Sequence, residues 1–275
     1  MTLLHAFLLG IIQGLTEFIP VSSTAHLLIS EHLLGIPANE ATFAFSVLVQ
    51  LGTIISLVIF FWKDLLTIAG DTLKSLKNVG RFNDMSANAK TGWYIIIATV
   101  PALAAGVLLK DMVEMLFKMP LIESAIRLFA AALLLTTAET AGKKTREMAS
   151  MTWKDALFVG VMQILAIFPG ASRSGTTISA GMFRGFNRPA AARFAFLMSV
   201  PVMLAAGAYE SLSLLNMPGL TQFLPLLLVG FITAAVVGWL AIRWLLDYLN
   251  RHSLYVFAAY CAVIGSICLV LNFIK

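Results

Sequence analysis

The sequence predicts an all-α polytopic membrane protein with six transmembrane helices and two re-entrant helix–turn–helix segments, arranged as an inverted-topology repeat. The first observation is composition: 59% of the 275 residues are hydrophobic and 12% are charged, whereas soluble domains are about half apolar and about a quarter charged. The second is that polar clusters interrupt two of the apolar segments, and the third is that these two segments match each other. We therefore expect one membrane domain over residues 1–275, with repeat halves at about 1–140 and 150–275.

The internal match pairs residues 5–13 with residues 155–163. Three residue types recur at the same offsets, as Ala6 and Ala156, Gly10 and Gly160, and Gln13 and Gln163. Each copy then reaches a proline, Pro20 or Pro169, and continues into a hydroxyl-rich turn, VSST after the first proline and GASRSGTT after the second. A series of matches in the same order indicates an internal duplication.

The first broken segment, residues 3–35, is long enough to cross the membrane once, but Pro20 and the Ser-Ser-Thr cluster interrupt it. Residues 25–34 would form about 15 Å of helix, which is half of a hydrocarbon core. Irregular backbone at membrane depth is tolerated only inside protein or beside a wet cavity, so we expect this segment to enter and leave on one side. Residues 153–188, broken at Pro169-Gly170 and again near Gly175, are the second candidate.

Six spans are expected in the remaining apolar stretches, at residues 43–62, 93–109, 121–138, 194–209, 223–242 and 253–273. Polar loops are expected between them, and the basic ones at 63–92, 139–154 and 243–252 are assigned to the cytoplasm by the positive-inside rule. This orientation holds only if each broken segment crosses the membrane an even number of times. The two hairpins then open on opposite sides, and their turns meet near mid-membrane, as in inverted repeats.

Charged residues outside the two turns have structural interpretations. Glu123 and Arg127, four residues apart at the start of the third span, are expected to pair with each other. Three arginines are expected to anchor the second hairpin at the membrane interface: Arg184, Arg188 and Arg193. Because most of the basic residues lie in loops that the orientation rule explains, the net charge of +5 does not call for a nucleic-acid partner, and we expect none.

The two turns contain side chains suited to phosphate chemistry, and ionisable groups in membrane segments read as functional by default. The first half contributes Glu17, Ser22, Ser23, Thr24 and His26, and the second contributes Ser172, Arg173, Ser174 and Thr177. A helix follows the second turn, so its small residues, including Gly175, and its backbone amides suit a phosphate. Arg173 adds a bidentate clamp, and a ligand phosphate is its expected partner because no acid lies nearby in the sequence.

A phosphate beside a serine and a histidine points to phosphoryl transfer. Ser23 precedes His26 by one helical turn, so His26 could take the proton of an attacking Ser23 hydroxyl. Glu17 could orient His26 or help to bind a divalent metal ion, and Arg173 would stabilise the transition-state oxygens. Structural alternatives exist: the serines could cap a half-helix, His26 could be an interior histidine, and Gln13 could bond between helices.

These motifs resemble the signatures of the bacterial undecaprenyl-diphosphatase family, the bacitracin-resistance family of integral-membrane phosphatases. The segment from Gln13 to Glu17 resembles its (Glu/Gln)-x-x-x-Glu motif, and PVSSTAH at 20–26 and PGASRSGTT at 169–177 resemble its two other motifs. The resemblance covers essentially the whole chain in length, hydropathy and motif order. The chain departs from many members at two positions: Gln13 stands where they have a second glutamate, and Ala25 where they have glycine.

The resemblance implies removal of the terminal phosphate from undecaprenyl diphosphate, which yields the monophosphate carrier lipid for peptidoglycan and other envelope polymers. It implies catalytic roles for Glu17, for Ser23 as nucleophile, for His26 and for the phosphate-binding Arg173, with Ser172, Ser174 and Thr177 as phosphate-loop hydroxyls. It also implies help from Mg²⁺ or Ca²⁺, a place in the bacterial inner membrane and an active site open to the periplasm.

We therefore predict a membrane phosphatase acting on a polyprenyl diphosphate. Its expected partners are that lipid and the bilayer, and a homodimer is possible. The candidate binding residues beside the catalytic set are Gln13, Ser22, Thr24, Ser172, Ser174, Gly175 and Thr177, and Glu17 is also the candidate metal ligand. The alternative is a transporter or flippase for an anionic lipid or a small anion, since such proteins also use broken helices in inverted repeats.

Overall fold

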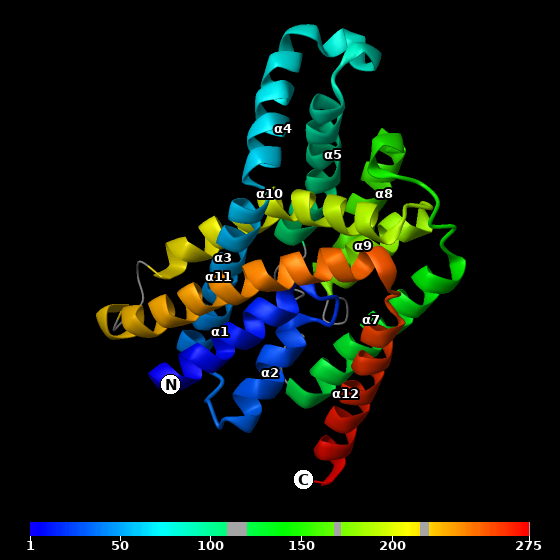
Figure 1. Ribbon diagram of the computed structural model, residues 1–275. Helices are drawn as coiled ribbons and strands as arrows, with labels where there is room; N and C mark the ends of the chain where they lie inside the picture. Colours follow the sequence, from blue (N-terminus) through cyan, green and yellow to red (C-terminus); the bar gives the residue numbers. More distant parts are fainter. Residues whose placement is uncertain (109–119, 168–171, 215–219, 275) are drawn as a thin grey trace.

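The computed structural model describes residues 1–108, 120–167, 172–214 and 220–274 (Figure 1). The helices within these ranges are α1 Leu3–Phe18, α2 Ser23–Leu33, α3 Glu40–Phe60, α4 Trp62–Ser75, α5 Ala87–Leu108, α7 Pro120–Ala141, α8 Trp153–Gln163, α9 Arg173–Phe183, α10 Arg188–Leu214, α11 Leu220–Arg251 and α12 Tyr255–Ile274. Short 3₁₀ segments, η1 Leu76–Asp84, η2 Met148–Ser150 and η3 Ile164–Ile167, lie between some of them. The described part of the chain is therefore all-helical, apart from an isolated bridge between Arg146 and Phe186.

Six helices of the described residues have the length and hydropathy to cross a membrane: α3, α5, α7, α10, α11 and α12. The six predicted spans are thus confirmed, and the chain is a multi-pass membrane protein. Three of the spanning helices contain an internal proline, Pro101, Pro201 or Pro225, and none ends there. Neighbouring helices commonly compensate for proline in membrane helices.

The first broken segment ends its helix where the sequence predicts. α1 stops at Phe18 and α2 starts at Ser23, on either side of Pro20. Proline disfavours helical backbone at the preceding residue, and Ile19 accordingly has an extended conformation, with φ −62° and ψ 129°. With 16 and 11 residues, the two helices reach about 24 Å and about 16 Å, short of the about 30 Å of a hydrocarbon core.

The second broken segment contains α8 and α9. Its predicted break at Pro169-Gly170 lies outside the described residues. The further break predicted near Gly175 is wrong, because α9 runs through that residue. Ser172 is the N-cap of α9, and its Oγ accepts a hydrogen bond from the Gly175 N–H at 3.2 Å. This cap satisfies a backbone donor that the first turn of a helix leaves open, so the helix begins at Arg173.

Two of the predicted polar loops are largely helical. Residues 63–92 form most of α4, η1 and the start of α5. α4 packs along α5, with which it rises side by side in Figure 1, through buried Ile68 and through Thr72, which lies against Gly92. The predicted loop 243–252 is mostly the end of α11, which extends to Arg251. Lysines and arginines spaced along these stretches obscured an apolar face that recurs at helical intervals.

The two broken segments make matching contacts with spanning helices. α1 lies along α11, and α8, its counterpart in the predicted internal repeat, lies along α5. Both contacts are close because of a repeated glycine. A Cβ on Gly10 would lie 2.7 Å from the carbonyl oxygen of Gly230, and a Cβ on Gly160 would lie 2.4 Å from that of Ala98. Small residues at membrane-helix interfaces allow this approach of backbones.

Replacing Gly160 with alanine is expected to destabilise the protein, because the added methyl group would overlap the Ala98 carbonyl oxygen and push α8 away from α5. Overpacking of this kind lowers the free energy of unfolding by about 1–3 kcal/mol, which a thermal unfolding midpoint in detergent would report. Gly70→Ala in α4 is the matched control, since nothing lies within 4 Å of its Cβ position. Equal midpoints for the two variants would contradict the close contact.

Ion pairs join the ends of the helices on the side of the basic connections. Asp155, at the start of α8, accepts hydrogen bonds from Arg146 Nη2 at 2.8 Å and from Arg184 Nε at 2.7 Å. Burial of Asp155 opposes its ionisation, but these hydrogen bonds outweigh it and hold the pKa of the carboxyl below its ordinary value. The other two predicted anchors are also paired, Arg188 with Glu139 and Arg193 with Asp64. All three arginines therefore connect helices, which the sequence did not reveal.

Candidate active site

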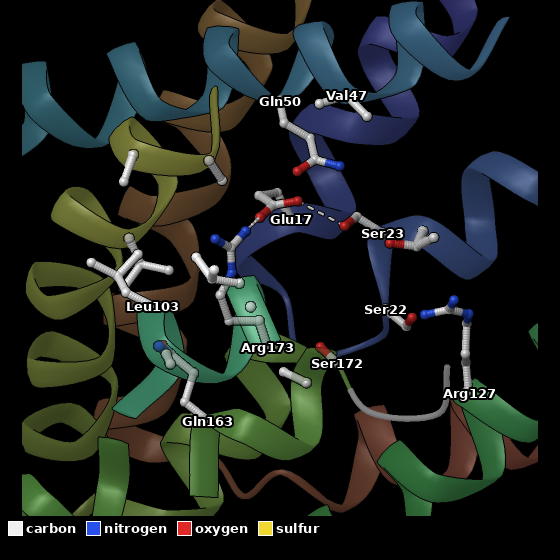
Figure 2. A pocket seen from close by; sticks show the side chains of 18 residues that line it. Glu17, Ser22, Ser23, Val47, Gln50, Leu103, Arg127, Gln163, Ser172 and Arg173 are labelled. Carbon is white, nitrogen blue, oxygen red and sulfur yellow. Dashed lines mark hydrogen bonds and ion pairs between the residues drawn. The ribbon is translucent and has the colours of Figure 1, made fainter. Parts of the chain in front are cut away.

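A cavity of about 730 Å³ lies between the two broken segments and the helices α3, α5, α7 and α10 (Figure 2). Its polar lining from the two broken segments includes Glu17, Ser22, Ser23, Thr24, Ser172 and Arg173. Much of the remaining wall is apolar and comes from α3, α5 and α10, with Val47, Leu103 and Val202 as examples. Candidate residues of the two halves of the chain therefore meet at one cavity.

Glu17 is the centre of the polar end of this cavity. Gln13, one turn earlier on α1, donates a hydrogen bond from Nε2 to Glu17 Oε2 at 2.7 Å. Ser23, in the first turn of α2, donates from Oγ to the same oxygen at 2.7 Å. The guanidinium of Arg173 pairs with the other oxygen, Oε1. The buried carboxylate thus links the start of α2 and the start of α9 to the end of α1, as Figure 2 shows.

The ion pair adds a partner that the sequence did not reveal. A ligand phosphate stays the predicted partner of Arg173 during the reaction, and Glu17, 156 positions away, pairs with it in the structure. The Arg173 side chain is 24% exposed while that of Glu17 is 4% exposed. Arg173 is therefore the member of the pair that an anion entering the cavity meets first.

The candidates of the second turn divide into two groups. Ser172 and Arg173 line the main cavity. Ser174 and Thr177 line a much smaller cavity of about 10 Å³ beside Glu17, and the Thr177 hydroxyl donates to the Arg173 carbonyl at 2.8 Å. Gly175 is buried, and a Cβ at this position would lie 3.7 Å from the Pro20 side chain. These three residues lie behind the cavity wall and support Ser172 and Arg173 instead of facing the cavity.

The candidate residues of the first turn also fall into two groups, those that line the cavity and one that does not. Ser22, Ser23 and Thr24 line the cavity, but His26 is not part of its lining. His26 Nδ1 lies 2.9 Å from the Ser22 carbonyl oxygen, and Nε2 lies 2.8 Å from the hydroxyl of Tyr260 on α12. The predicted contact between Ser23 and His26 is therefore replaced by the bond between Ser23 and Glu17, because both imidazole nitrogens have other partners. Tyr260 was missed, since it lies 234 positions from His26.

Three further polar residues of the cavity lie outside both turns. Gln50 on α3 lines it, and Gln163 at the end of α8 lines it as well. Arg127 on α7 also lines the cavity, is 4% exposed, and points its guanidinium toward Ser22 in Figure 2. From the sequence, Arg127 was expected only to pair with Glu123. Its presence gives the cavity a second arginine.

Comparison with known proteins identifies the family. The family described as bacitracin resistance protein BacA matches residues 6–267. A Syntrophobacter fumaroxidans protein named undecaprenyl-diphosphatase is 40% identical over 271 residues, which cover 96% of this chain and 95% of that protein. Proteins of the same name from Chloroherpeton thalassium and Geotalea daltonii are 39% and 40% identical, covering 96% and 100% of this chain and 95% and 99% of their own lengths. The chain therefore belongs to the bacitracin resistance protein BacA family.

Proposed function

We propose that the protein is an undecaprenyl-diphosphate phosphatase, which hydrolyses undecaprenyl diphosphate to undecaprenyl phosphate and inorganic phosphate. The observation that carries this proposal is Glu17, whose carboxylate binds the Ser23 hydroxyl with one oxygen and Arg173 with the other. A nucleophile, a base and a phosphate-binding cation are thereby present within one cavity. The name shared by the relatives, undecaprenyl-diphosphatase, supports this choice of substrate.

The cavity fits the two parts of such a substrate. Its apolar wall suits the first isoprene units of a prenyl chain, and its polar end suits a diphosphate. Arg173 and the start of α9 would hold the terminal phosphate, because a guanidinium and a helix N-terminus both favour an anion. Arg127, on the far side of Ser22 and Ser172 in Figure 2, supplies positive charge for the phosphate that stays on the lipid.

The reaction begins when the terminal phosphate replaces Glu17 as the partner of Arg173. The Glu17 carboxylate is then free to accept the proton of the Ser23 hydroxyl, with which it is already hydrogen-bonded. Ser23 Oγ forms a bond to the terminal phosphorus, and the bond from that phosphorus to the bridging oxygen breaks, so that prenyl monophosphate leaves. Water then attacks the phosphoserine, the Ser23 oxygen leaves and recovers its proton from Glu17, and inorganic phosphate is released.

The contacts favour Glu17 over His26 as the base in this sequence of steps. Ser23 Oγ lies 2.7 Å from Glu17 Oε2, within the distance that proton transfer needs. The two nitrogens of His26 are bonded to Ser22 and Tyr260. Ser172, at the N-cap of α9, and the adjacent backbone would stabilise the charge that develops on the phosphoryl oxygens.

A divalent cation, Mg²⁺ or Ca²⁺, fits this site as a companion of the diphosphate. The described residues contain no cluster of three or more His, Cys, Asp or Glu side chains able to hold a metal. Mg²⁺ is, however, commonly bound by one or two carboxylates together with substrate phosphates. Glu17 would provide the carboxylate, and Gln13 Oε1, buried without a hydrogen-bond partner in the described structure, would provide a neutral oxygen. The cation would neutralise part of the charge of the diphosphate.

The proposal includes the architecture of the two halves. The pairing of α1 with α11 and of α8 with α5 supports an inverted-topology repeat, since equivalent helices make equivalent contacts across the halves. The lengths of α1 and α2 support a re-entrant segment. The basic connections support a cytoplasmic mouth for the second hairpin. In the proposed orientation the first hairpin, with Glu17 and Ser23, opens to the periplasm of a bacterial inner membrane. The homodimer stays a prediction.

The test is phosphate release from undecaprenyl diphosphate by the purified protein in detergent, measured with added Mg²⁺ or Ca²⁺ and with EDTA. Turnover by the wild type would support the phosphatase, and its loss in EDTA would support the cation. Saturable lipid binding without phosphate release would overturn the proposal in favour of a flippase or transporter. Cysteine labelling of residues in the 63–92 segment from each side of the membrane would test the orientation independently.

A further inference from the structure

We propose that Tyr260 is a positioning residue for the reaction, acting through His26 on the turn that presents Ser23. The inference rests on the proposed function, because it assigns a role within the same site. It goes further by connecting α12, the last helix of the chain, to the first broken segment. It also gives His26 a role other than that of a base.

The turn before Ser23 has a backbone conformation that must be held in place. Ser22 has a φ of +68° and a ψ of +91°. For a residue with a side chain, positive φ is uncommon and strained, so the surrounding contacts have to maintain it. Ser22 lines the cavity and immediately precedes Ser23, so any relaxation of Ser22 would move the Ser23 hydroxyl.

His26 holds this turn through the Ser22 carbonyl. That oxygen accepts the backbone N–H of His26 at 3.2 Å and also contacts the imidazole Nδ1 at 2.9 Å. A carbonyl oxygen can only accept, so Nδ1 must carry the proton of this bond. In the neutral imidazole, Nε2 is then an acceptor without a proton. The ring therefore works here as a donor to the strained turn.

Tyr260 fixes that arrangement from α12. Its hydroxyl lies 2.8 Å from His26 Nε2, and an acceptor nitrogen at that position requires the tyrosine O–H to donate. The two rings are stacked, with centroids 5.6 Å apart and planes inclined by 7°. The hydroxyl selects the tautomer with the proton on Nδ1, and the stacking sets the orientation of the ring. With Nε2 occupied, neutral His26 has no lone pair for the Ser23 proton.

The effect on the reaction passes through the position of Ser23. While Ser22 keeps its conformation, Ser23 Oγ points at Glu17 Oε2 at 2.7 Å. A displacement of about 1 Å at a reacting group can lower a rate by about a hundredfold. Loss of the Tyr260 hydroxyl should therefore lower kcat, which depends on this alignment, and leave KM unchanged, because Arg173 and the apolar wall still bind the substrate.

Amide isosteres of His26 provide the decisive comparison. The amide nitrogen of asparagine reaches the position of Nδ1, whereas that of glutamine reaches the position of Nε2. If His26 acts as a donor to Ser22, His26→Asn should retain kcat within about tenfold of the wild type, while His26→Gln and His26→Ala should both fall by about a hundredfold. If His26 is a base or nucleophile, all three variants should be equally inactive, and the proposal is overturned.

Tyr260→Phe tests the second link, since it removes the hydroxyl and keeps the stacked ring. We expect kcat to fall about fivefold to tenfold, the effect of one hydrogen bond, with KM unchanged. In ¹⁵N spectra of histidine-labelled protein, His26 should change from the Nδ1–H tautomer to a mixture of the Nδ1–H and Nε2–H tautomers. Tyr255→Phe is the matched control on the same helix, because it removes a tyrosine hydroxyl from a residue that is 45% exposed, as Tyr260 is at 42%, and it should behave as wild type. Unchanged kcat and an unchanged tautomer in Tyr260→Phe would overturn the proposal.

These outcomes can be separated from failure of the proposed function. If the wild type releases no phosphate, the phosphatase is wrong, and the tautomer measurement still tests the bond between Tyr260 and His26. If the wild type is active, the ranking of the asparagine, glutamine and alanine variants tests the positioning role alone. Elution of each variant as a single species in detergent gel filtration confirms that the comparison is made on folded protein.

Discussion

Arg173→Ala is expected to reduce phosphate release from undecaprenyl diphosphate by about a thousandfold or more, since an arginine that binds a transferring phosphoryl group contributes in this range. The variant loses the cation that an incoming phosphate meets at the cavity. It also leaves the buried Glu17 carboxylate, whose side chain is 4% exposed, without its ion-pair partner. The unpaired negative charge of Glu17 then repels the anionic substrate. Both kcat and KM should therefore deteriorate in a steady-state phosphate assay.

Two further arginine variants make this result specific. Arg173→Lys keeps the charge and loses the bidentate geometry, so its activity should lie between those of wild type and Arg173→Ala. Arg193→Ala removes another arginine ion pair, with Asp64, in which both side chains are more than a third exposed, and it should leave the activity unchanged. If Arg173→Ala were as active as Arg193→Ala, Arg173 would not bind the reacting phosphate.

Ser23→Ala is expected to lower kcat by about a thousandfold or more with KM close to that of wild type, because removal of a nucleophile affects chemistry more than binding. The change removes one oxygen and leaves Glu17, Gln13 and Arg173 in contact. The measurement is initial-rate kinetics in detergent over a range of lipid concentrations. Acid-quenched wild type incubated with labelled diphosphate should also carry labelled phosphate on Ser23.

Ser30→Ala is the control for this variant. Ser30 lies on the same helix, and its hydroxyl only donates to the His26 carbonyl among the contacts of the described structure, so its loss should leave kcat within about threefold of the wild type. A Ser23→Ala protein that retained kcat and lost only affinity would exclude the serine as nucleophile. Such a result would favour the transporter, whose site needs hydrogen-bond donors and no turnover.

The parts of the fold that local sequence determines were predictable. Pro20 disfavours helical backbone at the residue before it, and α1 ends two residues before the proline. The apolar stretches were long enough to identify all six spans, although α11 extends nine residues past the predicted end at 242, to Arg251. In the first turn, Glu17, Ser22 and Ser23 were recognised because ionisable and hydroxyl groups are unusual in an apolar segment.

The parts that depend on contacts between distant residues were not predictable. Arg173 pairs with Glu17 across 156 positions and His26 with Tyr260 across 234, so neither pairing could be inferred from the sequence. A histidine three residues after a serine was read as its base, because the sequence does not show which way a ring turns. α4 was predicted to be part of a loop, because lysines interrupt its apolar face and the packing of that face against α5 is not visible in the sequence.

The close contact between α1 and α11 also sets how freely the first helix can change in evolution. On its outer face Leu4 and Phe7 are 63% and 46% exposed, so substitutions among apolar residues there would change only the surface that contacts lipid. On its inner face Gly10 has no room for a methyl group against the backbone of Gly230. A larger residue at position 10 would be acceptable only with a compensating change in α11, because it would tilt the helix that carries Glu17. Mutational tolerance in α1 should therefore follow the helical period, with a narrow spectrum at Gly10 although this residue takes no part in the chemistry.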